Sequence, residues 1–192
     1  MIDPLQIFNK WYTDELKSTN VRIPTACCLS TIGMDGYPNA RFVSMKEIID
    51  GAFIITGPLA SRKGLEIEQT KKVALSFWWT ATERQVRVQG DATGISAAQA
   101  DKYFAERERS AQIVSIVSEQ GKEIENIDEL NKRYRKEEDR LEEKAIKRPG
   151  NWGGFSIKPI RIEFMEFKPT RFHDRRLYEL NSGQWVLKQL QP

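Results

Sequence analysis

Apolar and polar residues alternate along most of this chain with the two-residue period of β-strands. Clusters of glycine, proline, asparagine and aspartate, which favour turns, separate these alternating segments. Asp50-Gly51 and Asn181-Ser182-Gly183 are the clearest of the turns. We therefore expect strands at residues 25–32, 39–48, 52–56, 73–80, 84–95, 155–167, 171–180 and 184–190.

Helical spacing replaces this alternation in the remaining segments. Asp3-Pro4 is an expected helix start, and it is followed by apolar residues at helical spacing, namely Leu5, Phe8, Tyr12 and Leu16. Ser96 with Gln99 forms an expected capping box, and a further helix is expected at about 111–119. The heavily charged residues 127–147 are typical of a solvated amphipathic helix. Strands, then helices, then strands favour an α+β fold built on a mostly antiparallel sheet or barrel.

Composition narrows the class of protein. The 192 residues are 40% hydrophobic, enough for one domain with a sizeable core. Thirty basic against 27 acidic residues leave a net charge of +3, too balanced for a protein that coats nucleic acid. The chain shows neither the apolar run of a membrane span nor a signal peptide at MIDPLQIF, so we expect a cytoplasmic protein without membrane contact. Cys27 and Cys28 are adjacent, which favours reduced core residues over a disulfide.

The candidate chemistry is that of anion binding. The sequence lacks the short motifs of nucleotide loops, hydrolase nucleophiles and zinc sites. It holds a single histidine, so catalytic triads and multi-histidine metal sites are hard to assemble, and we expect no metal. Arginine and lysine residues instead stand singly on expected strands and helix starts, as ligands of a bound anion do.

Ser61-Arg62-Lys63 opens an expected short helix and is the first candidate anion site. A helix start offers unpaired backbone N–H groups and a partial positive charge, which together with Arg62 and Lys63 would hold a phosphate. The alternative is an ordinary capped helix with two solvated cations, because such N-caps are common.

A second candidate is the expected strand RFHDR. Alternation along a strand would point Arg171, His173 and Arg175 to one face, where they repel each other unless an anion lies among them. The alternative is a solvated strand face whose charges pair with neighbouring acidic residues.

Other polar side chains on expected strands and helices are further candidates. Arg41 and Lys46 are an odd number of residues apart, so a regular strand places them on opposite faces. Both can contact one ligand only if the strand bulges or the ligand wraps around it. Gln85 lies on a polar strand face, where its amide suits the edge of a heterocycle, and Tyr103 and Arg107 share a helix face.

Together these motifs resemble the pyridoxine/pyridoxamine 5′-phosphate oxidase family over nearly the whole chain. The matching segments are DPLQIFNKW, RFVSMK, SRKG, ERQVRVQG, KYFAERER, NWGGF, RFHDRRLY and LQP. The resemblance implies one FMN-binding split β-barrel domain over residues 1–192, mostly antiparallel with flanking helices. It also implies a homodimer in which both chains build each FMN site, with a dimerisation and substrate segment at about 150–192.

The implied activity is oxidation of pyridoxamine 5′-phosphate or pyridoxine 5′-phosphate to pyridoxal 5′-phosphate. A hydride would pass from substrate C4′ to flavin N5, and O2 would then take the electrons to give H2O2. Arg171 and His173 would be the catalytic residues. The substrate-binding residues would be Lys46, Tyr103, Arg107, Arg171 and His173. The FMN contacts would be Arg41, Phe42, Val43, Ser44, Lys46, Ile55, Thr56, Ser61, Arg62, Lys63, Gln85, Gln120, Met165 and Arg175.

The chain also departs from the family pattern. Met165 and Ile55 stand where a Trp and a Tyr are usual, and Ala111 and Gly121 stand where serines lie near the phosphates. The basic arm of typical members is not found before Asp3. Two alternatives therefore stay open: an FMN oxidoreductase for another reduced heterocycle, such as a phenazine precursor, and a non-catalytic flavin-binding protein.

Overall fold

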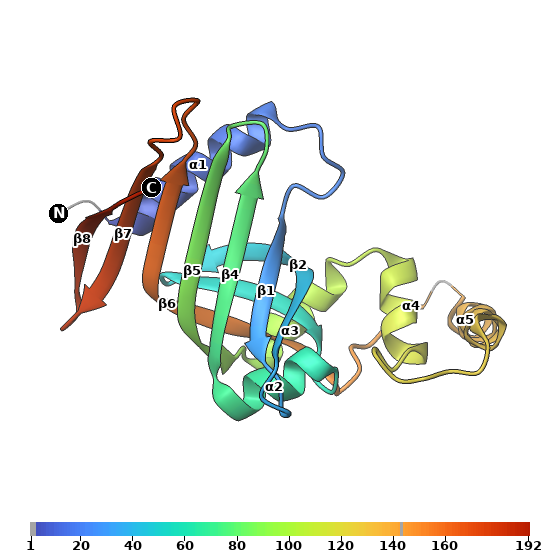
Figure 1. Cartoon of the computed structure of the whole chain (residues 1–192). Coiled ribbons are helices and arrows are strands. Elements are labelled where there is room, and N and C mark those ends of the chain that lie inside the picture. The colour runs from blue at the N-terminus through green and yellow to red at the C-terminus, as the bar shows by residue number, and fades with distance from the viewer. Residues whose placement is uncertain (1–2, 143) are drawn as a thin grey trace.

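The computed structural model describes residues 3–142 and 144–192 and places the strands of this part of the chain in one antiparallel sheet (Figure 1). The strand order is β3-β2-β1-β4-β5-β6-β7-β8, and β3 also pairs with β6. Six strands therefore close into a barrel, and β7 and β8 extend the sheet beyond it. The strands are β1 Ala26–Ile32, β2 Pro38–Ile49, β3 Ala52–Pro58, β4 Lys72–Trp79, β5 Arg84–Gly94, β6 Trp152–Glu166, β7 Asp174–Asn181 and β8 Gln184–Leu190.

The barrel closes through β6, because the two halves of one of its edges have different partners. Residues 152–157 pair with β3, whereas residues 161–166 pair with β7. The other edge of β6 pairs with β5. A single long strand thus contributes both to the closed barrel and to the C-terminal extension.

Two hairpin turns form where the sequence predicts them. Asp50 and Gly51 have φ angles of 50° and 76° between β2 and β3, and Ser182 and Gly183 have φ angles of 49° and 80° between β7 and β8. Two consecutive residues with positive φ are typical of the type I′ turn, whose twist matches that of the flanking strands.

Helices flank the barrel, as expected for an α+β protein. Asp3 caps the first helix by accepting a hydrogen bond from the backbone N–H of Leu5 at 3.0 Å, and Ser96 and Gln99 form the predicted capping box. None of the helices in the described part of the chain is both long and apolar enough to cross a membrane. They are α1 Pro4–Ser18, α2 Arg62–Thr70, α3 Ala97–Ala105, α4 Arg109–Val117 and α5 Ile127–Leu141.

The buried face of α1 differs from the predicted one. Leu16 is 42% exposed, whereas Trp11 and Glu15 are buried. The Glu15 carboxylate accepts hydrogen bonds from the backbone N–H groups of Ala81 and Thr82 in the β4–β5 turn. Glu15 is therefore buried as an acceptor for backbone donors, which an apolar pattern does not reveal.

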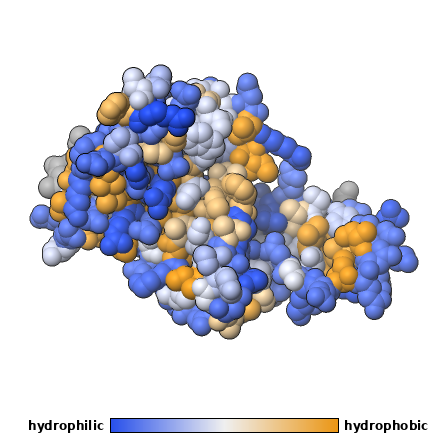
Figure 2. Space-filling view, in the orientation of Figure 1, coloured by the Kyte–Doolittle hydropathy of each residue, from blue (hydrophilic) through white to orange (hydrophobic). Residues whose placement is uncertain are grey.

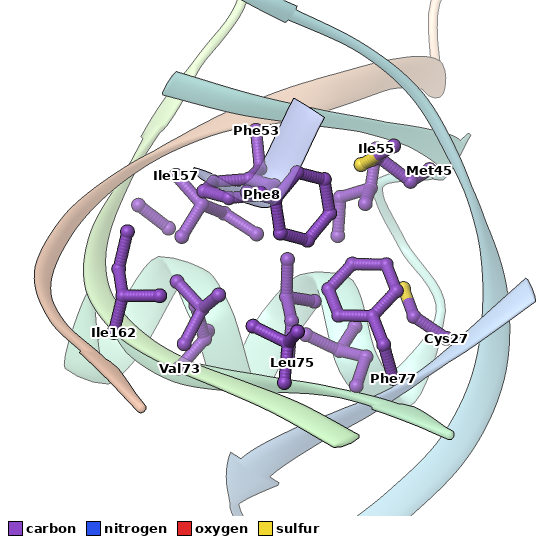
Figure 3. Close-up of a cluster of buried hydrophobic side chains, with 14 of the residues drawn as sticks. Phe8, Cys27, Met45, Phe53, Ile55, Val73, Leu75, Phe77, Ile157 and Ile162 are labelled. Atoms are coloured by element: carbon purple, nitrogen blue, oxygen red, sulfur yellow. The ribbon is translucent and has the colours of Figure 1, made fainter. Parts of the chain in front are cut away.

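Side chains from α1 and the barrel strands form the main core (Figure 3). Phe8 is fully buried, and its ring lies edge-on to Phe53 and Phe77 at centroid distances of 4.9 and 5.0 Å. Cys27 lies in this core as a free thiol, as predicted, and burial raises its pKa to about 12. Ile55 also points into this core, so its side chain does not reach the site that the sequence assigns to it.

The C-terminal strand begins later than the sequence predicts. Because β7 starts at Asp174, both Arg171 and His173 lie in the connection between β6 and β7. Arg171 adopts a left-handed φ of 67°, and its backbone N–H donates to the carbonyl of Lys168 at 3.0 Å. The prediction that Arg171, His173 and Arg175 alternate on one strand face is therefore wrong.

The charged helix α5 stands away from the barrel and packs against α4 (Figure 1). Leu141 is buried, and Leu130 and Tyr134 are half-buried, so this helix has an apolar side as expected of an amphipathic helix. Ala145 lies beyond the end of α5 and is exposed, so the helix is shorter than predicted.

Candidate active site

A cavity of about 640 Å³ opens where β2, the end of β3, the start of α2 and the end of α4 meet. Small-molecule sites usually measure about 300–1,000 Å³. Among the described residues, five basic side chains and no acidic one line this cavity, so it suits an anionic ligand. The lining residues are Arg41, Phe42, Val43, Ser44, Lys46, Thr56, Gly57, Pro58, Ser61, Arg62, Lys63, Arg107, Val114, Ser115, Ser118, Gln120, Gly121 and Trp152.

Strand β2 brings Arg41 and Lys46 to the same cavity although they are an odd number of residues apart. The pairing of β2 with β3 shifts register between Met45 and Ile48, which is the bulge that a shared ligand would require. The cavity also contacts residues 42–44, so it follows both faces of the strand. Bulge and cavity shape together resolve the conflict posed by the sequence spacing.

The start of α2 supplies the second wall of the cavity. Ser61 is the N-cap residue, but its hydroxyl donates to the carbonyl of Pro58 at 2.6 Å and does not cap the helix. Within residues 3–142 and 144–192, the first N–H groups of α2 therefore have no side-chain acceptor, as in helix starts that bind anions. Gly64 allows this close packing, because an added Cβ would lie 2.1 Å from the carbonyl oxygen of Leu59.

Lys63 reaches across this wall toward the segment after α4. Its Nζ donates to the Ser61 hydroxyl at 3.2 Å and to the side-chain oxygen of Gln120. Burial, and secondarily the charge of Arg41, lower the pKa of Lys63 below its usual value of 10.5. A bound anion would offset the charge of Arg41 and raise the pKa of Lys63 again, so protonated Lys63 and the anion stabilise each other.

Arg41 and Arg62 are held together by one carboxylate. Glu66 accepts a hydrogen bond from Arg41 Nη2 at 3.1 Å and another from Arg62 Nε at 2.9 Å. Glu66 itself is 1% exposed and lies behind the two arginines, outside the cavity lining. Arg62 also pairs with Asp35 at 3.2 Å.

Arg107 and Tyr103 separate, although the sequence places them on one helix face. Arg107 lies beyond the end of α3 and lines the cavity, with its guanidinium 5.2 Å from the ring centroid of Trp152. Burial lowers the pKa of Arg107, and its buried Nε has no hydrogen-bond partner among the described residues. Tyr103 is buried beside the cavity and donates to Glu47 at 2.7 Å; burial and this hydrogen bond raise its pKa.

A second group of expected site residues lies on the C-terminal half of the sheet. Gln85, Met165 and Arg175 are cross-strand neighbours on β5, β6 and β7. Arg175 is held in this row by Glu163, with Nη2 to Oε1 at 2.7 Å. These three residues do not line the first cavity.

Arg171 and His173 lie next to this row, in the turn that precedes β7. The backbone N–H of Lys168 donates to His173 Nδ1 at 3.1 Å, so the neutral imidazole carries its proton on Nε2. The His173 ring centroid is 4.7 Å from that of Phe167, which is itself 4.8 Å from Trp78. His173 is thus held in one orientation and one tautomer, and its Nε2–H group can donate a hydrogen bond to a ligand.

The expected site residues therefore fall into two groups within one chain. Most of the expected FMN contacts line the first cavity together with Arg107. The second group lies on β5, β6 and β7 and in the turn before β7, and it consists of Gln85, Met165, Arg171, His173 and Arg175. A hollow of about 340 Å³, lined by Phe42, Cys28, Ser76, Trp78 and Gln85 among others, lies between them on the outer face of the sheet.

Sequence reasoning missed several cavity residues. Ser115 and Ser118 place hydroxyls in the lining although Ala111 and Gly121 lack them. Trp152 stacks under Arg107, and the NWGGF segment was its only signal in the sequence.

The model of the family described as pyridoxamine 5′-phosphate oxidase matches residues 13–181. The chain belongs to the pyridoxamine 5′-phosphate oxidase family. It is 37% identical over 190 residues to the pyridoxine/pyridoxamine 5′-phosphate oxidase of a Cyanothece species, covering 99% of this chain and 89% of the relative. The enzyme of the same name from Rubrobacter xylanophilus is 38% identical, with 99% of this chain and 87% of the relative covered. The chain is accordingly an oxidoreductase of this family.

Solved structures place it among the same split barrels. PhzG from Burkholderia lata, in complex with tetrahydrophenazine-1-carboxylic acid, superposes with a TM-score of 0.93 at 26% identity, covering 99% of this chain and 93% of PhzG. A pyridoxamine 5′-phosphate oxidase-related FMN-binding protein from Nostoc punctiforme has a TM-score of 0.81 at 16% identity, covering 100% and 98% of the two chains. The predicted fold, an FMN-binding split β-barrel, is confirmed.

FMN is the cofactor of this pyridoxamine 5′-phosphate oxidase family member, and the cavity fits it. Arg41, Arg62 and Lys63 lie around a helix start whose N–H groups have no side-chain acceptor in the described part of the chain, which suits a terminal phosphate. Arg107 lines the same cavity and adds a further cation that can contact a second anionic group.

Proposed function

We propose that this chain oxidises pyridoxamine 5′-phosphate or pyridoxine 5′-phosphate to pyridoxal 5′-phosphate while O2 is reduced to H2O2. With pyridoxamine 5′-phosphate the reaction also consumes one water and releases the amino group as ammonia. The bound flavin supplies the redox chemistry by accepting a hydride and passing the electrons to O2. The observation that carries this proposal is the convergence of five basic side chains on one cavity in a nearly neutral protein. Two phosphorylated molecules, the cofactor and the substrate, account for that concentration of charge.

Different residues of the chain bind the cofactor and the substrate. Arg41, Arg62 and Lys63 would hold the FMN phosphate, and Lys46 on β2 would contact the flavin elsewhere in the same cavity. Arg107, held over Trp152, binds the substrate phosphate with the help of Tyr103. Arg171 and His173 cover the substrate ring, with His173 donating through Nε2. Orientation of this kind is the protein's main contribution to flavin chemistry.

Each site is completed by a second copy of the chain. The two groups of site residues lie apart in one chain, and the outer face between them exposes Phe42 by 79% and Trp78 by 55%. Figure 2 shows pale to orange surface over the front strands β1 and β4. A homodimer formed through this face covers the exposed aromatic side chains and brings Gln85, Arg171 and His173 of one chain to the cavity of the other.

Trp78→Glu is expected to weaken this homodimer, raising its dissociation constant at least about tenfold, because a charge would be buried against apolar surface. FMN should dissociate together with the subunits, since ligand bound only by the dimer stabilises it. Light scattering with flavin absorbance over a dilution series measures both. Leu65→Glu is the control, because Leu65 is 50% exposed on α2 and lines a different hollow. A wild-type monomer that retains FMN would contradict the shared site.

The FMN affinity is expected to fall at alkaline pH, because the pKa of Lys63 is lowered in the unliganded protein. Protonated Lys63 binds the phosphate, so affinity is complete below that pKa and is lost as the pH rises through it. Lys63→Arg should retain its affinity over the same interval. Titrations of FMN against riboflavin between about pH 7 and about pH 10 measure the effect, with riboflavin as the phosphate-free reference. Parallel pH curves for the two flavins would show that Lys63 does not contact the phosphate.

A reduced phenazine carboxylate is the second candidate substrate. The likeness to PhzG in complex with tetrahydrophenazine-1-carboxylic acid favours it, as does Met165, which leaves the sheet row without a large aromatic side chain. Arg107 favours the phosphorylated vitamer, because a half-buried cation beside Trp152 suits a phosphate group.

Anaerobic mixing separates these candidates. FMN-loaded protein is combined with pyridoxamine 5′-phosphate, pyridoxine 5′-phosphate or the reduced phenazine carboxylate, and bleaching of the flavin absorbance is followed. We expect the phosphorylated vitamers to bleach the flavin at least about tenfold faster, a difference of about 1.4 kcal/mol. Faster bleaching by the phenazine would assign the chain to the second substrate class, and no bleaching by any of the three would favour a flavin-binding protein without catalysis.

A further inference from the structure

Glu66 on α2 is a fully coordinated buried carboxylate behind the phosphate cavity. It is 1% exposed and accepts hydrogen bonds from four side chains. Asn39 Nδ2 and Arg62 Nε donate to Oε1 at 2.7 and 2.9 Å, and Thr31 Oγ1 and Arg41 Nη2 donate to Oε2 at 2.5 and 3.1 Å. Three elements, β1, β2 and α2, are therefore tied together at one side chain.

The geometry restrains the two arginines that line the cavity. Arg41 is held by Glu66 and also donates to Thr31 Oγ1 and to the carbonyl of Leu29 at 3.5 Å. Arg62 is 61% exposed, so its position depends on its ion pairs with Glu66 and Asp35. Long side chains that are ordered before a ligand arrives lose less conformational freedom on binding. Glu66 thus prepares the guanidinium groups without contacting the ligand itself.

We propose that Glu66 is a positioning residue that sets Arg41 and Arg62 in place for the phosphate of FMN, an inference that rests on the phosphate placement proposed above. Its charge acts in the opposite direction, since a carboxylate behind the cations repels a phosphate. Neutralising the carboxylate should therefore lower FMN affinity if positioning dominates, and raise it if charge repulsion dominates.

Glu66 is charged at neutral pH in this arrangement. Burial raises its pKa, but the hydrogen bonds from Thr31, Arg62 and Arg41 outweigh burial and hold the pKa below its usual range. Glu66→Gln therefore removes a real charge. It also places an amide N–H₂ group, a donor, where two of the four incoming donors need an acceptor.

Titration of the apoprotein with FMN and with riboflavin tests the proposal, because riboflavin lacks only the phosphate. Glu66→Gln should lower FMN affinity by about tenfold and change riboflavin affinity by less than about twofold, so that the preference for FMN shrinks. An unchanged or increased FMN affinity would overturn the proposal in favour of charge alone. An equal loss for both flavins would overturn it in favour of a merely structural role.

Three variants complete the experiment. Glu15→Gln is the matched control, because Glu15 is also buried and accepts hydrogen bonds in a different part of the barrel; it should lower the melting temperature without changing the preference for FMN. Glu66→Asp serves if Glu66→Gln does not fold: it retains the charge but shortens the reach, and it should cause a smaller, still FMN-selective loss. Lys63→Ala tests the phosphate placement itself.

These variants distinguish a wrong placement of the phosphate from a wrong role for Glu66. If Lys63→Ala does not reduce the preference for FMN, the phosphate does not bind at this cavity and the proposed placement fails. If Lys63→Ala reduces it but neither Glu66 variant does, the placement stands and only the role of Glu66 is wrong. If Glu66 acts through Arg41, then Glu66→Gln should also have little further effect on FMN in an Arg41→Ala background.

Discussion

Arg41→Ala is expected to lower the affinity for FMN by about 10- to 150-fold, because a hydrogen bond to a charged group contributes about 1.5–3 kcal/mol. Arg41 lines the cavity and is held by Glu66, Thr31 and the Leu29 carbonyl, so alanine removes an ordered side chain that we propose binds the phosphate. It also leaves Glu66 with one donor fewer in a buried position, which should cost about 1–3 kcal/mol of stability.

Fluorescence titration at constant salt measures this change, with thermal unfolding recorded on the same preparations. Arg161→Ala is a suitable control, since Arg161 is also a strand arginine in an ion pair, with Glu179 at 3.1 Å, but lies outside the cavity. An Arg41→Ala protein that binds FMN like the wild type would remove Arg41 from the phosphate site.

Arg171→Ala is expected to lower kcat/KM for the phosphorylated vitamers by about 10- to 1,000-fold, or about 1.4–4 kcal/mol of transition-state stabilisation. Arg171 stands at the turn before β7, exposed and beside His173, where a second subunit's substrate would meet it. Alanine removes the guanidinium while preserving the Cβ, so the turn at φ 67° keeps its strain and its backbone hydrogen bond. The fold and most of the FMN affinity should therefore survive.

Neighbouring arginines serve as controls for this prediction. Arg176→Ala should lower stability without a comparable loss of kcat/KM, because the Arg176 guanidinium lies 5.7 Å from the ring centroid of Trp11. Arg175→Ala should weaken FMN binding first, and His173→Ala should reduce turnover less than Arg171→Ala does. Wild-type turnover by Arg171→Ala, or its failure to fold, would make the turn a structural element only.

Local chemistry explains which features could be predicted from the sequence. Asp50-Gly51 forms its turn because these residues tolerate positive φ. Ser96 and Gln99 cap α3 because the side chain of each accepts a hydrogen bond from the backbone N–H of the other. RFHDR alternates in the same way as a strand, yet Pro169 and the left-handed Arg171 form a turn there instead. Alternation of polar residues does not distinguish the two, because it carries no signal of hydrogen-bond pairing.

The least predictable parts of the site depend on contacts between distant segments. In the sequence, Glu66 resembles any other charged residue on a short helix. Its burial depends on side-chain hydrogen-bond donors that lie 25–35 residues away on other elements. The bulge after Met45 likewise depends on pairing with β3. The family resemblance predicts Arg41 and Lys63 as FMN contacts, and the structure shows that both line one cavity. It also shows that other expected contacts, Gln85, Met165 and Arg175, lie on a different part of the sheet in the same chain.

Aerobic turnover of the FMN-loaded protein is the most direct test of whether the cationic cavity serves a phosphorylated vitamer. With pyridoxamine 5′-phosphate we expect one pyridoxal 5′-phosphate and one H2O2 for each O2 consumed. With unphosphorylated pyridoxamine, kcat/KM should be lower by about tenfold or more, since Arg107 would then lack its ligand. A protein loaded with FMN that oxidises neither phosphorylated vitamer, or that oxidises the unphosphorylated form equally well, would contradict the proposed function.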